Sequence, residues 1–134
     1  MSQEIVDVVR RWFDRLDAGD PAPDLCSPDI EFRNWSESLT YGPYHGHDGL
    51  HRWWHEVHDP DVGTEIRLFR LEEIIEVDEV SVVTVQRAHA RARFTGLEAD
   101  YRWGAVISVR GGKIASALGY STPEEAKRAA GLSE

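Results

Sequence analysis

Four strand-like segments follow one another in the second half of the chain, and they constrain the fold more than any other feature. Short turn signals such as Gly96-Leu97 and Gly111-Gly112 separate the segments. Consecutive strands joined by short turns pair as antiparallel neighbours. The pattern therefore predicts an antiparallel meander over Thr64–Val77, Val80–Thr95, Ala99–Val109 and Ile114–Tyr120.

The first half of the chain supplies helices. Apolar residues recur at helical spacing from residue 5 to residue 16, and Asp48 is placed to cap a second helix that runs to about His58. Between these helices, Asp29–Trp35 is a candidate strand. After the meander, Thr122-Pro123-Glu124-Glu125 has the form of a capping box with proline at the first helical position. Helices followed by a meander indicate an α+β fold.

Length, charge and cysteine content exclude several classes of function. The 134 residues are enough for one domain, covering 1–134. The chain has 15 basic and 24 acidic residues, and its net charge of −9 repels nucleic-acid backbones and anionic lipids. No stretch approaches the roughly 20 apolar residues of a membrane span, and the N-terminus lacks the pattern of a secretory signal. We therefore expect a cytoplasmic protein with no nucleic-acid or membrane partner.

The turn at Gly96-Leu97 predicts which residues share a face of the sheet. A two-residue loop there places Ala92 beside Tyr101 and Ala90 beside Trp103. Small residues opposite large rings are typical of a packed or ligand-lined inner face, and Gln86 has the same parity. The opposite parity predicts a solvent-facing side that carries Arg87, His89, Arg91 and Arg93.

The face of the last strand depends on the Gly111-Gly112 turn. If Gly112 sits in a left-handed bulge, Ala117 and Gly119 join the inner face. A plain two-residue turn would instead place Leu118 and Tyr120 there. We favour the bulge.

Three histidines and one cysteine have simple structural interpretations. His51, His55 and His58 form a stripe on the second helix, about 110° from its apolar face. Arginine stands where a zinc protease has its glutamate, so we interpret the stripe as a solvated helix face and predict no metal and no cofactor. Cys26 is the only cysteine, which excludes an internal disulfide, and we expect a small buried thiol.

Short motifs along the chain together resemble the SnoaL-like branch of the NTF2-like superfamily. They are Val8-Val9-Arg10-Arg11-Trp12-Phe13, Tyr44-His45-Gly46-His47-Asp48-Gly49-Leu50, Gly112-Lys113-Ile114 and Ala129-Ala130-Gly131-Leu132. The resemblance spans nearly the whole chain. It implies a cone-shaped barrel, in which a curved antiparallel sheet wraps round N-terminal helices and encloses a pocket, and it implies a homodimer. Members include ketosteroid isomerases, polyketide cyclases and limonene-type epoxide hydrolases, so the fold does not by itself give the function.

The catalytic residues of two of these enzyme classes are missing at the matching positions. In a ketosteroid isomerase alignment, the base aspartate falls on Asn34, the tyrosine on Trp12 and the second aspartate near Gly104 or Ala105. For a limonene-type epoxide hydrolase, Asn34 matches the asparagine and Phe32 replaces the tyrosine. The charged relay of that enzyme falls on Ala90, Ala88 and Gly119.

We therefore expect a small-molecule pocket protein that binds an apolar or aromatic ligand. The predicted lining residues are Trp12, Phe32, Asn34, Trp54, Gln86, Tyr101 and Trp103. One alternative is a cofactor-independent isomerase, cyclase or dehydratase that uses His89, His45 or Tyr101 as acid or base. His89 would reach the inner face only if a bulge inverted its strand. A second alternative is a structural dimerisation module whose outer sheet face meets a partner.

Overall fold

The computed structural model describes residues 2–35, 41–57, 64–92 and 95–132. Before the meander, the chain forms helix α1 (Ser2–Asp17), the 3-10 helix η1 (Pro23–Leu25), strands β1 (Cys26–Arg33) and β2 (Tyr44–His45), and helix α2 (Gly46–Val57). The meander and the C-terminal helix then follow as β3 (Thr64–Glu76), β4 (Ser81–Ala92), β5 (Glu98–Arg110), β6 (Lys113–Tyr120) and α3 (Pro123–Ala129). Helix α2 begins at Gly46, so Asp48 lies in its first turn and the prediction that it caps the helix is wrong.

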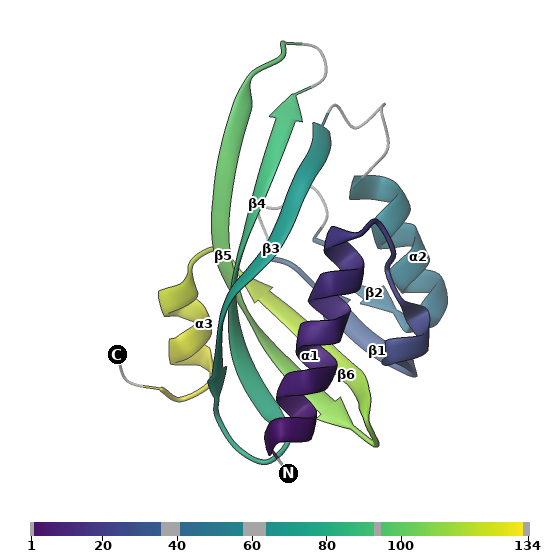
Figure 1. Ribbon diagram of the computed structural model, residues 1–134, viewed down its shortest axis with the longest axis vertical. Helices are drawn as coiled ribbons and strands as arrows, with labels where there is room; N and C mark the ends of the chain where they lie inside the picture. The colour runs from purple at the N-terminus through teal and green to yellow at the C-terminus, as the bar shows by residue number, and fades with distance from the viewer. Residues whose placement is uncertain (1, 36–40, 58–63, 93–94, 133–134) are drawn as a thin grey trace.

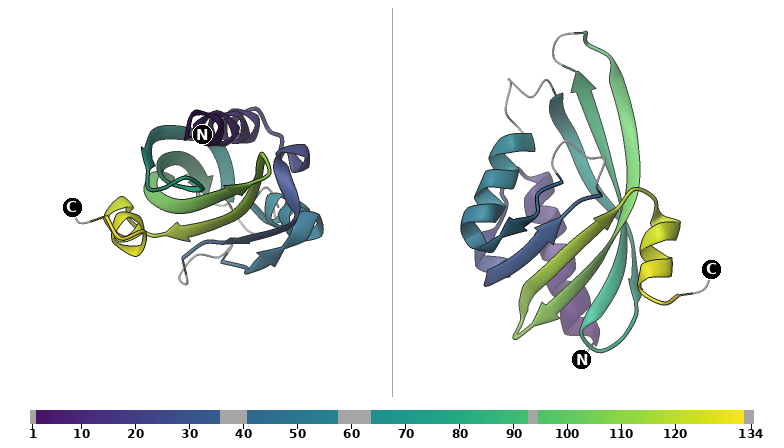
Figure 2. Two further views of the ribbon diagram at one scale, coloured as in Figure 1. Left: turned by 90° about the horizontal axis from the view of Figure 1, so that it is seen from below. Right: turned by 180° about the vertical axis from the view of Figure 1, so that it is seen from behind.

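The strands form one curved sheet, which Figures 1 and 2 show wrapping past α1. Within the described residues its order is β2-β1-β6-β5-β4-β3. The meander β3 to β6 is antiparallel, as the short turns predict, whereas β1 pairs with β6 in parallel. The sheet is therefore mixed, and the expectation of an antiparallel sheet is wrong for this pair. Strands β1 and β6 are far apart in sequence, so no turn signal predicts their relative direction. The α+β class and the NTF2-like cone fold are confirmed.

The sheet has two faces, which helices cover from opposite sides (Figure 2). We call the face toward α1 the inner face and the face toward α3 the outer face. The hydrophobic core fills the lower part of the inner face, where buried residues of α1 such as Val9 and Trp12 pack with Val82 and Ile107 of the sheet. On the other side, a Cβ atom at Gly104 would lie 2.8 Å from Cβ of Ala126, so α3 packs directly on the outer face.

The β4–β5 pairing confirms the predicted faces but not the predicted partners. Ala88 lies opposite Tyr101, and Ala90 opposite Ala99, so the expected pairs of Ala92 with Tyr101 and Ala90 with Trp103 are wrong. The shift is an even number of residues, which keeps every side chain on its predicted face. The strands meet at another point than the predicted Gly96-Leu97 loop implies, since β4 ends at Ala92 and β5 begins at Glu98.

The β5–β6 hairpin contains the expected bulge at a different residue. Gly111 and Gly112 both have positive φ, at 57° and 78°, and form a plain two-residue turn between Arg110 and Lys113. The extra residue is Ala115, because Ser108 pairs with Ser116 and Val109 with Ile114. The register beyond it places Ala117 opposite Ile107 and Gly119 opposite Ala105, which confirms the predicted inner-face position of Ala117 and Gly119.

Candidate functional site

Three of the predicted lining residues lie in an aromatic cluster formed by α1, β1 and α2. Trp12 is only 2% exposed, and its Nε1 donates a hydrogen bond to the carbonyl oxygen of Pro21 at 3.0 Å. The Phe32 ring contacts the rings of Trp12 and Trp53, with centroids 6.4 and 4.6 Å away. Trp54 is half-buried with its ring 5.3 Å from that of Trp53. Trp12 and Phe32 therefore pack the core, and the indole N–H of Trp12 is already used within the protein.

A second group comes together on the inner face above the core. Gln86 of β4 lies opposite Trp103 of β5, and Ala88 lies opposite Tyr101. Gln86 is 2% exposed, whereas Tyr101 is 47% exposed. Polarity and burial therefore change along this face, from a buried amide at the edge of the core to an aromatic ring that reaches solvent.

Two buried oxygen atoms of this face have no hydrogen-bond partner among the described residues: Oε1 of Gln86 and Oγ1 of Thr84. A buried acceptor without a partner destabilises a protein by about 1–3 kcal/mol, and such groups are few in native structures. Thr84 was not among the residues predicted from the sequence. Its parity matches that of Gln86, so the same alternation could have identified it.

The inner face of β4 and β5 carries no charged side chain in the described residues. In the described part of β4 and β5 its side chains are apolar, aromatic or amide and hydroxyl groups, namely Val82, Thr84, Gln86, Ala88, Ala90, Ala99, Tyr101, Trp103, Ala105, Ile107 and Val109. Tyr101 is the one residue of this set with a phenol hydroxyl, and it was named from the sequence as a candidate acid or base. A ligand held on this face would meet no charge from these strands.

Asn34 and Trp35 lie beside this face, where β1 and β6 end. Oδ1 of Asn34 lies 3.0 Å from the position that a Cβ atom at Gly119 would take, so Asn34 packs directly on the glycine backbone. The Trp35 ring lies 6.0 Å from the ring of Trp103, centroid to centroid. Trp35 was also not predicted from the sequence, because it falls at the end of a strand, where alternation no longer gives the direction of a side chain.

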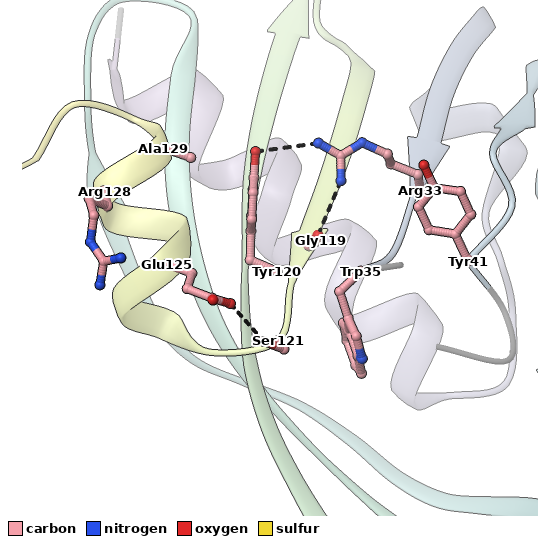
Figure 3. A pocket seen from close by; sticks show the side chains of 9 residues that line it. All are labelled: Arg33, Trp35, Tyr41, Gly119, Tyr120, Ser121, Glu125, Arg128 and Ala129. Atoms are coloured by element: carbon pink, nitrogen blue, oxygen red, sulfur yellow. Dashed lines mark hydrogen bonds between the residues drawn. The ribbon is translucent and has the colours of Figure 1, made fainter. Parts of the chain in front are cut away.

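A groove of about 640 Å³ opens near Trp35, between α3 and the end of β1 (Figure 3). Its walls include Arg33, Trp35, Tyr41, Tyr120, Glu125 and Arg128. Arg33 and Tyr120 lie on the outer face, since Arg33 pairs with Leu118 and Tyr120 pairs with Gly104. The groove is therefore a second concave site, separate from the inner face and adjoining it at Trp35.

The acid/base candidates other than Tyr101 lie away from the inner face. His89 lies on the outer face, with Nδ1 2.8 Å from Oδ1 of Asp100 and Nε2 2.5 Å from Oε1 of Glu98. Hydrogen bonds to these two carboxylates raise the pKa of His89 above its ordinary value. No bulge inverts β4 between Gln86 and Arg91, so His89 keeps the parity of Arg87. His45 is exposed on the short strand β2.

Two of the three histidines considered for metal binding are on the surface of α2. His51 and His55 are exposed on α2, and His58 lies outside the described residues. No group of three or more potential metal ligands occurs in the part of the chain that the structure describes. Cys26 is buried, and burial raises the pKa of its thiol to about 12, as expected for a small buried residue.

None of the described helices is both long enough and apolar enough to cross a membrane.

Comparison with known proteins places the chain in a family. The family model described as a SnoaL-like domain matches residues 9–117. An NTF2-like protein from Burkholderia xenovorans is similar in structure, with 23% identity, 96% of each chain covered and a TM-score of 0.71. So is a Δ5-3-ketosteroid isomerase from a Mycobacterium species, with 17% identity, 87% of this chain and 92% of that chain covered, and a TM-score of 0.66.

A third similar structure is a Mycobacterium tuberculosis protein in complex with estradiol-17β-hemisuccinate, with 14% identity, 87% of this chain and 92% of that chain covered, and a TM-score of 0.70. No curated protein matches the sequence. At these sequence identities, similarity to the solved structures shows the fold alone. The family model covers most of the chain and therefore shows the family. The helices α1 and α2, the curved sheet and the matched residues 9–117 together show that the protein belongs to the SnoaL-like family and has the NTF2-like fold.

Proposed function

We propose that this protein binds a small, uncharged, largely aromatic or apolar molecule on the inner face of its sheet. The observation that carries the proposal is a pair of buried oxygens, Gln86 Oε1 and Thr84 Oγ1, that have no hydrogen-bond partner in the described part of the chain. A hydroxyl or N–H group of a ligand would satisfy either oxygen. It would thereby recover stability that the unliganded protein lacks.

The surroundings of these oxygens fit the rest of such a ligand. Trp103 and Tyr101 offer flat aromatic surface, and the small side chains of Ala88 and Ala90, each 3% exposed, lie beside them on the same face. Pockets for small molecules are commonly apolar, with a few polar groups that orient the ligand. The steroid derivative bound by the Mycobacterium tuberculosis neighbour supports a ligand with an apolar ring system, while its hemisuccinate arm adds a carboxylate that the inner face of β4 and β5 does not match.

The proposal gives different roles to the other predicted lining residues, which are Asn34, Trp54, Trp12 and Phe32. Asn34 lies beside Gly119, just beyond the end of β1, and would orient a ligand from there. Trp54 would form part of the wall on the side of α2. Trp12 and Phe32 would act by holding the floor of the site, since both are packed in the core.

Native mass spectrometry of the freshly purified protein tests this function. The expected result is a mass excess of a few hundred daltons, or saturable binding of neutral aromatic compounds added to protein of bare mass. Gln86→Leu, which removes the oxygen at similar volume, should weaken that binding about tenfold, in line with one lost buried hydrogen bond. Arg87→Gln, one residue along β4 but on the outer face, is the matched control. The proposal would be contradicted if Gln86→Leu and Arg87→Gln bound the ligand equally well, or if the native chain bound no such compound.

Two further expectations remain proposals. Among the acid/base candidates, Tyr101 alone lies on the inner face, so turnover as an isomerase, cyclase or dehydratase would depend on Tyr101 and on groups of the ligand itself. A homodimer in the cytoplasm is the expected state of the protein, and its test is argued at the end of the Discussion.

A further inference from the structure

The groove on the outer face has the size of a ligand site and a composition different from that of the inner face. Its volume, about 640 Å³, falls within the range of small-molecule pockets. Figure 3 shows Arg33 and Glu125 on opposite sides of Tyr120, with Trp35 and Tyr41 on the β1 side. Three aromatic rings and a cation thus line one concave surface.

Arg33 is held in this groove by neutral groups. Its Nη1 donates to the carbonyl oxygen of Gly119 at 3.5 Å, and its Nη2 donates to the Tyr120 hydroxyl at 3.4 Å. The guanidinium carbon lies 5.3 Å from the centre of the Tyr120 ring. Across the ranges that the structure describes, no carboxylate forms an ion pair with Arg33. Since a guanidinium has five N–H donors and these two bonds are long, it retains capacity for a strong acceptor.

The other charges of the groove limit the charge of its occupant. Arg128 adds a second cation, and Glu125 adds one anion, whose Oε1 accepts a hydrogen bond from the Ser121 hydroxyl at 2.6 Å. The lining therefore carries a net charge of about +1 on a chain whose net charge is −9. A monoanion would match it, whereas a phosphate dianion would be repelled by Glu125 and by the rest of the molecule.

We propose that this groove binds a planar aromatic carboxylate, with the carboxylate on the Arg33 guanidinium and the aromatic ring against Trp35 and Tyr41. Arginine and carboxylate form paired parallel hydrogen bonds, which favours a carboxylate over other monoanions. Because Trp35 also contacts Trp103, the occupied groove would share a wall with the inner face.

Calorimetric titration tests the proposal with two compounds. They are 2-naphthoate and 2-naphthalenemethanol, which has the same ring system without the charge. We expect 2-naphthoate to bind saturably and the alcohol to bind at least tenfold more weakly at this site. In parallel spectra, the indole N–H resonance that Trp35→Phe removes should shift on addition of 2-naphthoate.

Arg33→Gln should weaken 2-naphthoate binding at least tenfold, and Arg33→Lys should weaken it less, because the charge stays while the paired geometry is lost. Arg10→Gln removes the same charge from the exposed surface of α1 and should leave binding unchanged. Circular dichroism of each variant separates a local effect from unfolding.

The inner-face variant Gln86→Leu separates this site from the proposed function. Loss of 2-naphthoate binding in Gln86→Leu but not in Arg33→Gln would place the compound on the inner face and overturn the groove proposal. No saturable binding of 2-naphthoate, or equal binding of acid and alcohol to the Gln86→Leu variant, whose inner-face site is weakened, would overturn it as well. Neither result would affect the binding of neutral ligands expected on the inner face.

Discussion

His89 illustrates how two neighbours can set the charge of one residue on an exposed sheet face. Its two ring nitrogens contact Asp100 and Glu98, and these hydrogen bonds raise its pKa. In the unfolded chain the pKa of histidine is about 6.5. The folded state therefore binds the proton more tightly. This contribution to stability is complete below about pH 6.5 and is lost as the pH rises through the raised pKa of the folded state.

We predict that the His89→Gln variant is less stable than the native chain at pH 5.5 to 6.5, and that the difference disappears at alkaline pH. Urea unfolding at a series of pH values measures it. The ring titration of His89 followed by NMR should have its midpoint above 6.5, and the double substitution Glu98→Gln and Asp100→Asn should lower that midpoint. A native midpoint at or below 6.5 would show that the two carboxylates do not hold the proton in solution.

Gly104 allows a test of how α3 is fixed to the sheet. A Cβ atom there would lie 2.8 Å from Cβ of Ala126 and 2.9 Å from Cα of Pro123, so Gly104→Ala must displace the helix. We expect a loss of roughly 1–3 kcal/mol in the free energy of unfolding, the usual range for overpacking. Urea denaturation measures this loss. Ala126→Gly in the same chain should restore part of it, and a Gly104→Ala variant of native stability would contradict this packing.

The sequence predicts elements and faces well, because both depend on local alternation. All four meander strands and the inner-face position of Gln86, Tyr101 and Trp103 follow from parity alone. Alternation does not reveal where a bulge falls, so the extra residue at Ala115 was assigned to Gly112. Nor does it reveal how distant strands pair, which is why the parallel contact of β1 with β6 was not predicted.

The candidate site was less predictable than the fold, because it depends on contacts between segments far apart in sequence. Trp12 has the ring and the N–H of a ligand-binding residue, but its hydrogen bond to the carbonyl oxygen of Pro21 becomes evident only in the folded chain. The same holds for the outer groove. Arg33 and Tyr120 are 87 positions apart, and neither carries a local signal that the other lies beside it.

At the scale of the whole molecule, charge is distributed so that two copies could meet through the outer face. Helix α3 packs against β5 around Gly104, and beyond it the outer face carries groups of both signs. Glu72 bonds Arg87 and Arg102, each at 2.8 Å, and the carboxylates around His89 continue the pattern. A surface with both signs can complement itself across a two-fold axis, as a homodimer interface requires.

We therefore predict that the protein sediments as a dimer of its 15.2 kDa chain, and that the double substitution Arg87→Glu and Arg91→Glu shifts it to the monomer. Reversing two charges places like charges opposite one another in the paired faces and also breaks the contact of Arg87 with Glu72. The matched control reverses the charges of two residues on the exposed side of α1, by Arg10→Glu and Arg11→Glu, and this variant should remain dimeric. A monomeric native chain would refute the dimer, and a variant that stays dimeric would exclude this face as the interface.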